Sequence, residues 1–349
     1  MGGVSRAQPV ENTTRPSNRT WASTYGPQYE LSYTGPLSFS HLPYARCLEN
    51  ETSAFDIAIL GLPFDTAVTY RPGARFGPHA IRSGSRRQQL GVGYTMQWGF
   101  DPYQRGYNVI DCGDVPVSPF DNALAMDQIE VAYSTLLDRT PVKAYNGSAT
   151  GDLALDGVER PRIISRAFCK FELTLNGCMI AHYQDTWPMV APGQTTDQSL
   201  VTHGTFFYVA HQEGLIANNS IHAGTRCKMA GTADMDNDAS VGFRIVSADD
   251  IDDLGVSEVI NRIRTRIGDT PVYLSLDIDV IDPGMAPATG TPEAGGWTTR
   301  EVKRIIRGLA GLNFVGADIV EVSPAYDQGD ITGIAAADLV HDFISLFTS

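Results

Sequence analysis

The feature that most constrains this chain is the alternation of short apolar runs with amphipathic stretches from residue 55 onward. Each apolar run is rich in Ile, Val or Leu and ends at Gly, Asp or Pro, which is typical of a buried strand. The predicted strands span residues 55–62, 107–111, 177–183, 220–224, 272–279 and 315–322. Apolar strands that alternate with helices predict a parallel sheet covered on both faces, so the predicted fold class is α/β.

Local signals place helices between these strands. Asp121 is a predicted N-cap for a helix whose apolar residues lie on one face. Thr298 and Glu301 form a predicted capping box before a second amphipathic helix. Residues 139–160 are rich in Gly, Ala and Asp, which predicts an exposed excursion from the sheet.

The composition narrows the class of partner. The 349 residues include 26 Lys and Arg against 40 Asp and Glu, a net charge of −14. No basic cluster is present to neutralise phosphates, so nucleic acid is not expected as a partner, whereas a cationic small molecule or a divalent metal suits the charge. No apolar run reaches the ~18 residues that span a bilayer, so no membrane partner is expected either. Residues 1–45 predict an N-terminal arm and residues 46–349 a single domain.

The cysteines and the N-terminal sequence indicate in which cellular compartment the protein is expected. Five cysteines are scattered without a CxxC pair, so a disulfide scaffold is not expected and a reducing cytoplasm is the default. The N-terminal sequence has no apolar signal region as written, and secretion stays open if a leader was removed before Met1. Five Asn-x-Ser/Thr sequons point weakly toward secretion, at Asn12, Asn18, Asn50, Asn146 and Asn218.

Candidate functional residues follow the predicted strands, because the loops after parallel strands carry the chemistry of such sheets. The polar residues at these positions are Asp65, Asp114, Asp185, Asp277, Asp279 and Glu321. Asp277 and Asp279, two apart at a strand end, are expected on one face of the strand. Two carboxylates that close repel each other unless a cation or a shared proton relieves them, so they predict a cation site. The alternative is a pair of solvated turn aspartates.

Seven short motifs give the chain a family resemblance. They are GLPFDT (61–66), RPGARFGP (71–78), DCGDV (111–115), HGTF (203–206), SLDIDVIDP (275–283), GGWTTRE (295–301) and EVSP (321–324). With them, residues 55–345 resemble the ureohydrolases, the family of arginase and agmatinase, and within it the fungal agmatinase-like branch. The resemblance implies an arginase-like three-layer α/β/α fold with a mostly parallel sheet of about eight strands. It also implies a homo-oligomer, trimer or hexamer, and hydrolysis of a guanidinium group by a hydroxide that bridges two Mn ions.

The resemblance assigns metal ligands, and this sequence keeps part of the set. Family members hold the two ions with six side chains, which come from a GGDHS run, a DAHxD run and the SxDxDxxDP run. Asp185, Asp277 and Asp279 match ligand positions, whereas Ala181 and Tyr183 stand where the family has Asp and His. At most one divalent ion, Mn or Mg, is therefore expected, and a binuclear Mn site is not.

The GGDHS run is absent, and two alignments stay open. One places Leu153 at the position of the family's histidine. The other treats residues 161–165 as the preceding strand and places Lys170 there; it is preferred because that segment is predicted to be a strand. Neither alignment supplies an imidazole.

Further residues match functional positions of the family. His203 matches the position linked with proton transfer, and Glu321 matches the carboxylate that faces the guanidinium of the substrate. Asp327 is a candidate contact for a substrate amine, with loop capping as the alternative. Tyr183 is a candidate acid or oxyanion donor, and Lys170 a further candidate contact for the substrate.

Three functions are compatible with these residues. The first is a repurposed enzyme of fungal specialised metabolism, which performs acid/base chemistry on an amine- or guanidine-bearing small molecule with one metal ion or none. In it, Asp277 and Asp279 act as base or cation clamp and His203 is a proton shuttle, with Asp185 as a further catalytic candidate. The second is a Mn-dependent ureohydrolase that releases urea from an agmatine-type guanidine. The third is a catalytically inactive pseudoenzyme that partners an active paralogue.

Overall fold

The computed structural model describes residues 30–68, 70–143, 154–155, 158–168, 177–180, 202–229 and 231–349. The chain divides into two compact units, residues 1–35 and residues 36–349. In the described part of the first unit, the Leu31 amide donates to Thr34 Oγ1 at 2.7 Å and closes a turn. All elements named below belong to the second unit.

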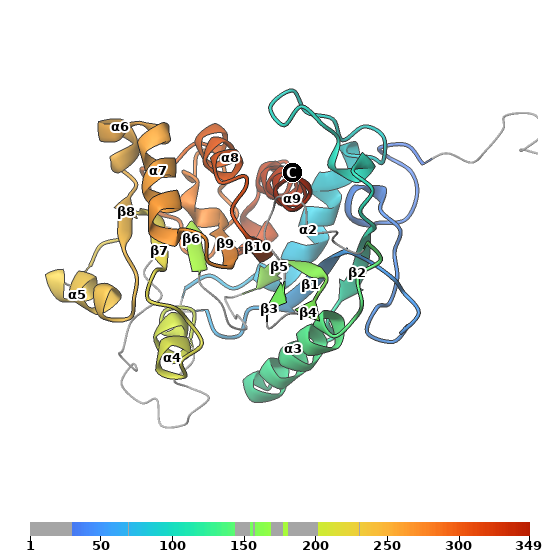
Figure 1. Cartoon of the computed structure of the whole chain (residues 1–349), viewed down its shortest axis with the longest axis horizontal. Coiled ribbons are helices and arrows are strands. Elements are labelled where there is room, and N and C mark those ends of the chain that lie inside the picture. The colour runs from blue at the N-terminus through green and yellow to red at the C-terminus, as the bar shows by residue number, and fades with distance from the viewer. Residues whose placement is uncertain are drawn as a thin grey trace, which may run out of the picture. The chain divides into compact units, whose positions relative to one another are not determined.

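An eight-stranded sheet forms the centre of the larger unit, in the order β2-β1-β5-β10-β9-β6-β7-β8 (Figure 1). Its strands are β1 (Ile57–Phe64), β2 (Val109–Asp114), β5 (Arg162–Phe168), β6 (Gly177–Ile180), β7 (Ile221–Thr225), β8 (Ile245–Ser247), β9 (Val272–Asp277) and β10 (Phe314–Val320). Every pairing in this sheet is parallel. A separate antiparallel pair is formed by β3 (Ala154–Leu155) and β4 (Val158–Glu159). The predicted α/β class and the strand number are confirmed.

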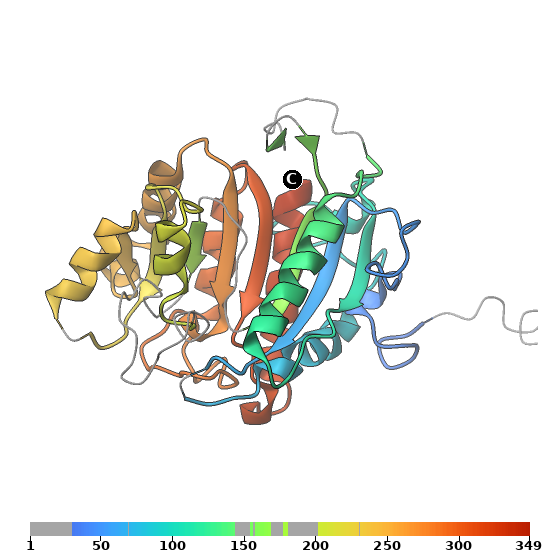
Figure 2. The same cartoon turned by 90° about the horizontal axis from the view of Figure 1, so that it is seen from below.

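Helices lie on both faces of the sheet. They are α2 (Gly77–Gly84), α3 (Asn122–Leu137), α4 (Phe206–Gln212), α5 (Thr232–Ser240), α6 (Asp250–Leu254), α7 (Val256–Ile267), α8 (Thr299–Gly308) and α9 (Ile331–Thr348). In Figures 1 and 2, α2, α7, α8 and α9 cover one face, and α3 and α4 lie on the other. This arrangement gives the three layers expected of the fold.

Strand alternation divides the core between the two faces. In β1, Ile57 and Ile59 pack in the cluster that contains α8 and α9, whereas Ala58 and Leu60 pack in the cluster with α3. Because successive side chains of a strand point to opposite faces, a strand covered on both sides must be apolar throughout, as β1 is. Among the described helices, α9 has the length and apolar composition of a membrane span, with a mean hydropathy of 1.3, but 78% of it is buried inside the unit.

The predicted elements agree closely with the observed ones. Each of the six predicted strands overlaps an observed strand, although residues 181–183 of the third lie outside the described residues. Asp121 caps α3 by accepting from the Leu124 amide at 3.1 Å, and Thr298 and Glu301 form the capping box of α8. β5 lies between β1 and β10, which agrees with the alignment that makes residues 161–165 a strand. The short strand β8 was not predicted from the sequence.

The structure contains a disulfide that the cysteine spacing did not indicate. Cys47 is bonded to Cys112, with the two Cα atoms 5.2 Å apart and both side chains buried. The pair forms because the preceding segment lies along β2, where the Ala45 amide donates to the Asp111 carbonyl at 2.9 Å. The expectation from cysteine spacing fails for this pair, since residues 65 apart in sequence meet only once the sheet has formed.

Candidate active site at the ends of the parallel strands

The candidate active site lies where the strands end. Because all eight strands are parallel, their carboxyl ends meet at one edge of the sheet. β9 and β10 are neighbours, and Val320 pairs with Asp277 at their ends. The acidic residues that follow these two strands therefore begin from adjacent backbone positions.

Asp277 and Asp279 form the acidic centre of this edge. Asp277 is the last residue of β9, and Asp279 lies in a single 3-10 turn, Ile278–Val280. Asp277 Oδ1 accepts a hydrogen bond from the Asp279 amide at 3.0 Å. The turn holds the two residues together, so the strand alternation expected to extend to residue 279 is wrong beyond Asp277. Each residue is only 1% exposed, which excludes the alternative of two solvated turn aspartates.

Arg226 fastens this acidic turn to the loop before α8. It follows β7, and its Nη2 donates to the Asp279 carbonyl at 2.8 Å. Its Nε donates to the Glu293 carbonyl at 3.1 Å. Burial lowers the pKa of Arg226, and the negative charges of Asp279 and neighbouring acids oppose that shift. This role of Arg226 was not predictable from the sequence, because its partners are backbone carbonyls distant in the chain.

Glu321 reaches the same region from β10. It is 3% exposed and has a left-handed backbone, with φ of 63°. For a residue other than glycine this conformation costs on the order of 1 kcal/mol, and such strain is concentrated at functional sites. A Cβ at Gly290 would lie 3.1 Å from Glu321 Oε2, and the next residue, Thr291, donates through Oγ1 to Asp279 Oδ2 at 3.3 Å. The segment 290–291 thus lies against both Glu321 and Asp279.

The loop after β1 closes against the loop after β10. Asp65 Oδ2 accepts from the Gly73 amide at 2.8 Å, and Asp65 Oδ1 accepts from Arg75 Nε at 2.5 Å. A Cβ at Gly73 would lie 3.4 Å from Ser323 Cβ, so this loop passes close to the loop that carries Glu321. Asp65, one of the candidates at a strand end, therefore shapes the loop.

Asp114, a second candidate at a strand end, is the exposed member of an ion-pair cluster whose other residues are buried. Arg82 donates from Nη1 to Asp114 Oδ1 at 2.8 Å, and from Nε and Nη2 to both carboxylate oxygens of Asp111. Arg166 of β5 donates to Asp111 at 3.3 Å, and burial lowers the pKa of Arg166 to about 10 although Asp111 opposes the shift. Burial alone would raise the pKa of Asp111, but Arg166 and Arg82 outweigh it, so this pKa lies well below its usual range. The cluster neutralises its own charge and fixes α2 to β2.

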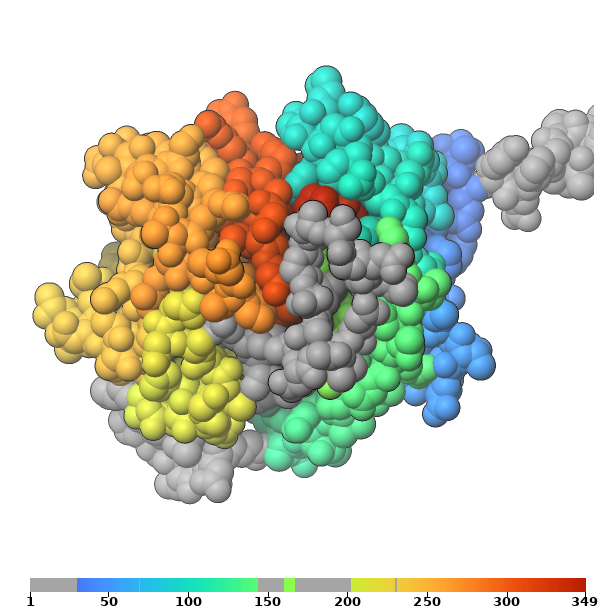
Figure 3. Space-filling model, viewed as in Figure 1, coloured from blue at the N-terminus to red at the C-terminus, as the bar shows by residue number. Residues whose placement is uncertain are grey.

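His203 and Asp327 each lie shortly before a helix, His203 before α4 and Asp327 before α9. His203 is 7% exposed and lies just before α4, which belongs to the yellow surface in Figure 3. Asp327 caps α9: its Oδ1 accepts from the Thr332 amide at 3.1 Å and its Oδ2 from the Gly333 amide at 3.1 Å. The capping alternative for Asp327 is therefore the one that the structure supports.

Three other predicted site residues, Lys170, Tyr183 and Asp185, lie outside the described residues. The remaining positions contain no group of three or more His, Cys, Asp or Glu arranged to hold a metal ion; this statement covers only the described ranges. Within those ranges, Asp277 and Asp279 are the predicted metal ligands that the structure brings together.

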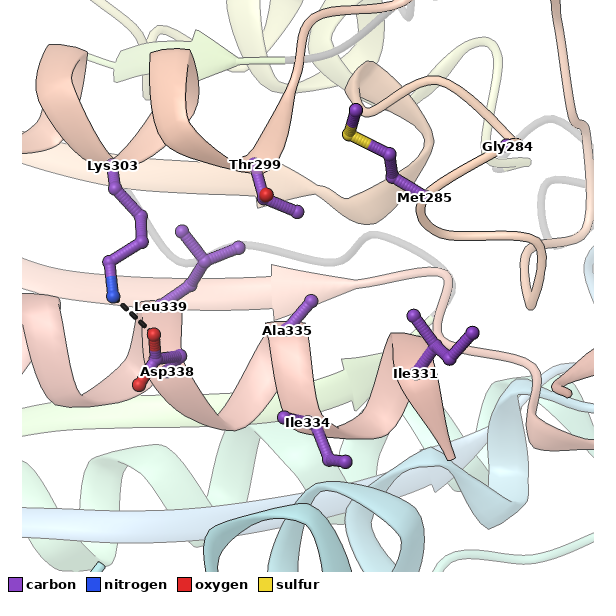
Figure 4. Close-up of a pocket in the computed structure, with 9 residues that line it drawn as sticks. All are labelled: Gly284, Met285, Thr299, Lys303, Ile331, Ile334, Ala335, Asp338 and Leu339. Atoms are coloured by element: carbon purple, nitrogen blue, oxygen red, sulfur yellow. Dashed lines mark hydrogen bonds and ion pairs between the residues drawn. The ribbon is translucent and has the colours of Figure 1, made fainter. Parts of the chain in front are cut away.

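A cavity of about 440 Å³ lies elsewhere, between α8, α9 and the loop at Gly284 (Figure 4). Its lining is mainly apolar, and Figure 4 shows one ion pair within it, between Lys303 and Asp338. None of the acidic residues after β9 and β10 lines this cavity, so it is separate from the candidate active site.

Comparisons with known proteins agree with the motifs and the fold. The model of the Arginase family matches residues 55–146 and 181–345, and leaves out residues 147–180. "Putative agmatinase 1" of Schizosaccharomyces pombe is 46% identical over 91% of this chain and 84% of its own length. A crystal structure of a hypothetical agmatinase from Burkholderia thailandensis has a TM-score of 0.73 and 32% identity, covering 91% of both chains.

Proclavaminate amidino hydrolase from Streptomyces clavuligerus superposes with a TM-score of 0.73 and 29% identity, covering 91% of this chain and 99% of that one. The matched ranges include all seven motifs. The buried acidic turn, the adjoining Glu321 and six of the eight strands lie within the same ranges, whereas β5 and β6 lie in the segment left out. This chain belongs to the arginase family.

Proposed function

We propose that this chain hydrolyses the guanidinium group of a small cationic substrate and releases urea, as an agmatinase-type ureohydrolase. The observation that carries the proposal is the burial of Asp277, Asp279 and Glu321 together at the carboxyl edge of the sheet. Three carboxylates in a site of low exposure favour a cation in their midst. The agmatinase names of the relatives at high coverage support the same substrate class.

The donor chemistry of the acidic turn fits a divalent metal ion. Asp277 and Asp279 offer carboxylate oxygens, which are the ligands that Mn and Mg prefer. The hydrogen bond from the Asp279 amide to Asp277 Oδ1 fixes the turn before any ion arrives. These two residues, with Asp185 as the sequence candidate for a third, would hold it. A bound ion there would lower the pKa of water, so that hydroxide is available near neutral pH.

The chain's own residues account for binding and proton movement. Glu321 is proposed to pair with the substrate's guanidinium, because its backbone places a buried carboxylate beside Gly290. His203 is proposed to carry the proton that the leaving amine requires. Arg226 keeps Asp279 and the loop at Glu293 in register through hydrogen bonds to their backbone carbonyls.

A second candidate is acid/base chemistry on an amine or guanidine with one metal ion or none. The observation that favours it is the interruption of the family match over residues 147–180, together with Ala181 and Tyr183 at two ligand positions. On this candidate, Asp277 and Asp279 serve as base or cation clamp. A homo-oligomer, trimer or hexamer, is part of both proposals and is measured by light scattering.

The deciding experiment combines urea release with metal content. The purified chain is incubated with Mn, desalted, analysed for metal per chain, and assayed with agmatine and arginine. Urea release that disappears in Asp277→Asn but persists in Asp252→Asn, an exposed aspartate of α6, supports ureohydrolysis. A rise in Tm with amines, without urea release from any guanidine, would support the second candidate instead. Lack of both activities, with co-purification of a paralogue, would indicate a pseudoenzyme.

A further inference from the structure

An exposed asparagine lies in a turn suited to covalent modification. Asn50 begins the tripeptide Asn50-Glu51-Thr52, the acceptor sequence for N-linked glycans. All three residues are exposed. Thr52 Oγ1 donates to Asn50 Oδ1 at 2.7 Å, and the Thr52 amide donates to the same oxygen at 3.0 Å. Within the described residues, Asn50 Nδ2 has no hydrogen-bond partner, so the nitrogen that would be glycosylated is available.

Hydrogen bonds attach the turn around Asn50 to the folded unit. The Asn50 amide donates to the Arg46 carbonyl at 2.8 Å. Arg139, two residues after α3, donates to the carbonyls of Cys47 and Glu51, the former at 3.0 Å. The blue surface that contains this turn projects at the right-hand side of Figure 3. A glycan on Asn50 would extend into solvent without disturbing these contacts.

An independent feature three residues earlier points to the same compartment. Cys47 forms the buried disulfide with Cys112. Such bonds form and persist in secretory and extracellular environments and are rare in the cytosol. Enzymatic transfer of N-linked glycans also takes place on secreted chains. The disulfide and the sequon are chemically unrelated, and the secretory route favours the formation of the one and the modification of the other.

We propose that this chain matures in an oxidising secretory compartment, where Cys47 and Cys112 are joined and Asn50 carries an N-linked glycan. The proposal is independent of the proposed function, and it differs from the cytoplasmic location expected from cysteine spacing. In the first step, the two thiols lose two protons and two electrons to the disulfide of a lumenal oxidoreductase, which becomes a dithiol. In the second, Asn50 Nδ2 bonds to the anomeric carbon of a lipid-linked oligosaccharide, the bond from that carbon to the lipid pyrophosphate breaks, and Nδ2 gives up one proton.

The sequon at Asn218 provides an internal comparison. Its third residue, Ser220, is fully buried, and the Ser220 hydroxyl donates to the Ala217 carbonyl at 3.2 Å rather than to Asn218. Asn218 is exposed, but a Cβ at Gly242 would lie 2.7 Å from Asn218 Cα, so the backbone at Gly242 is packed against the backbone of the asparagine. Asn218 is therefore expected to stay unmodified in the same molecule. The other sequons lie outside the described residues.

The experiment is to secrete the full chain from a yeast with an added leader and to map it by mass spectrometry. Digestion without reductant should yield a peptide pair joined through Cys47 and Cys112. Treatment with a peptide N-glycosidase in heavy-oxygen water should convert Asn50, but not Asn218, to labelled Asp. Asn50→Gln and Thr52→Ala should each remove this label, and Thr52→Ser should retain it.

Two results would overturn the proposal. One is recovery of Asn50 unmodified from secreted protein, whether or not Asn218 is labelled. The other is recovery of Cys47 and Cys112 as alkylated thiols. Because these readouts do not involve urea release, they are separate from any failure of the proposed function.

Discussion

The acidic residues at the strand ends differ in what surrounds them, and the surroundings determine their chemistry. Asp65 is engaged by Arg75 and Asp114 by Arg82, so each carboxylate has a cation within hydrogen-bond distance. Asp277 and Asp279 instead share a turn, with one accepting from the amide of the other. The sequence placed all four at strand ends. It did not distinguish the carboxylates that pair with an arginine from the two that share a turn. Arg75 lies in a loop and Arg82 in a helix, and each meets its carboxylate only in the folded chain.

At Arg226 we expect a positioning role that can be measured. Arg226→Gln removes the donors that hold the Asp279 and Glu293 carbonyls, so the acidic turn loses its alignment. A displacement of about 1 Å in such a site reduces turnover by up to ~100-fold. We therefore expect kcat for urea release to fall roughly 10- to 100-fold, with a smaller change in KM. Arg300→Gln, an exposed residue of α8, is the control. A lower Tm with unchanged kcat would show that Arg226 is only structural.

At Asp111 we expect a pH dependence of stability. Its pKa is lowered in the folded protein, so the ionised carboxylate stabilises the fold above its unfolded pKa of about 3.9. That contribution is lost as the pH falls below this value toward the folded pKa. Asp111→Asn should lower the free energy of unfolding at pH 7 by about 3–5 kcal/mol, because Arg166 remains buried without this partner and Arg82 keeps only Asp114.

The same variant should also reduce the loss of stability on acidification, measured by urea unfolding at pH 7 and near pH 3. Asp138→Asn is the control, since Asp138 forms an exposed pair with Arg160 worth under about 1 kcal/mol. If Asp111→Asn loses as much free energy of unfolding between pH 7 and pH 3 as the unmodified chain does, Asp111 is not the source of the pH dependence.

At the scale of elements, the segment from β9 to α8 builds most of the candidate site. Ile281 bridges to Trp297 and draws the intervening loop back onto the strand end. The capping box was predictable because its signal is local, two residues three apart. The end of β9 at Asp277 was not, because the residues that follow it are as apolar as the strand itself and only tertiary contacts bend them into a turn.

The capping box of α8 gives a prediction for this element. The Glu301 amide donates to Thr298 Oγ1 at 3.2 Å, and the Thr298 amide donates to Glu301 Oε2 at 2.8 Å. Thr298→Ala should lower the free energy of unfolding by about 1 kcal/mol. Thr299→Ala, one residue into the helix, should change it by less than about 0.5 kcal/mol. Equal effects of the two substitutions in urea unfolding would argue against the capping role.

At the scale of the whole molecule, contacts between distant parts of the chain complete the larger unit. The α/β class and most strands were predictable, because periodicity is a local property. The Cys47–Cys112 pairing and the cluster around Asp111 were not, because they join segments that approach only in the finished sheet.

The disulfide should contribute measurably to overall stability. It closes a loop of 65 residues, which in the chain-entropy account stabilises the fold by about 4 kcal/mol. The double variant Cys47→Ser and Cys112→Ser should therefore unfold at lower urea concentration than the oxidised protein. Cys227→Ser is the control, because Cys227 takes no part in a disulfide. Coincident unfolding curves for the double variant and the oxidised wild type would contradict this expectation.

The long-range packing of α9 has a consequence for biosynthesis. Gln88 after α2 bonds to Asp338 of α9, a partner 250 positions later, and Trp98 bonds to Asp342, 244 positions later. At about 5–20 residues per second, the ribosome needs on the order of 10–50 s to deliver those partners. During that interval the apolar side of the early helix has nothing to cover it. A nascent chain of this kind depends on chaperones to shield that surface, and a message truncated before α9 would yield a product that cannot close its core.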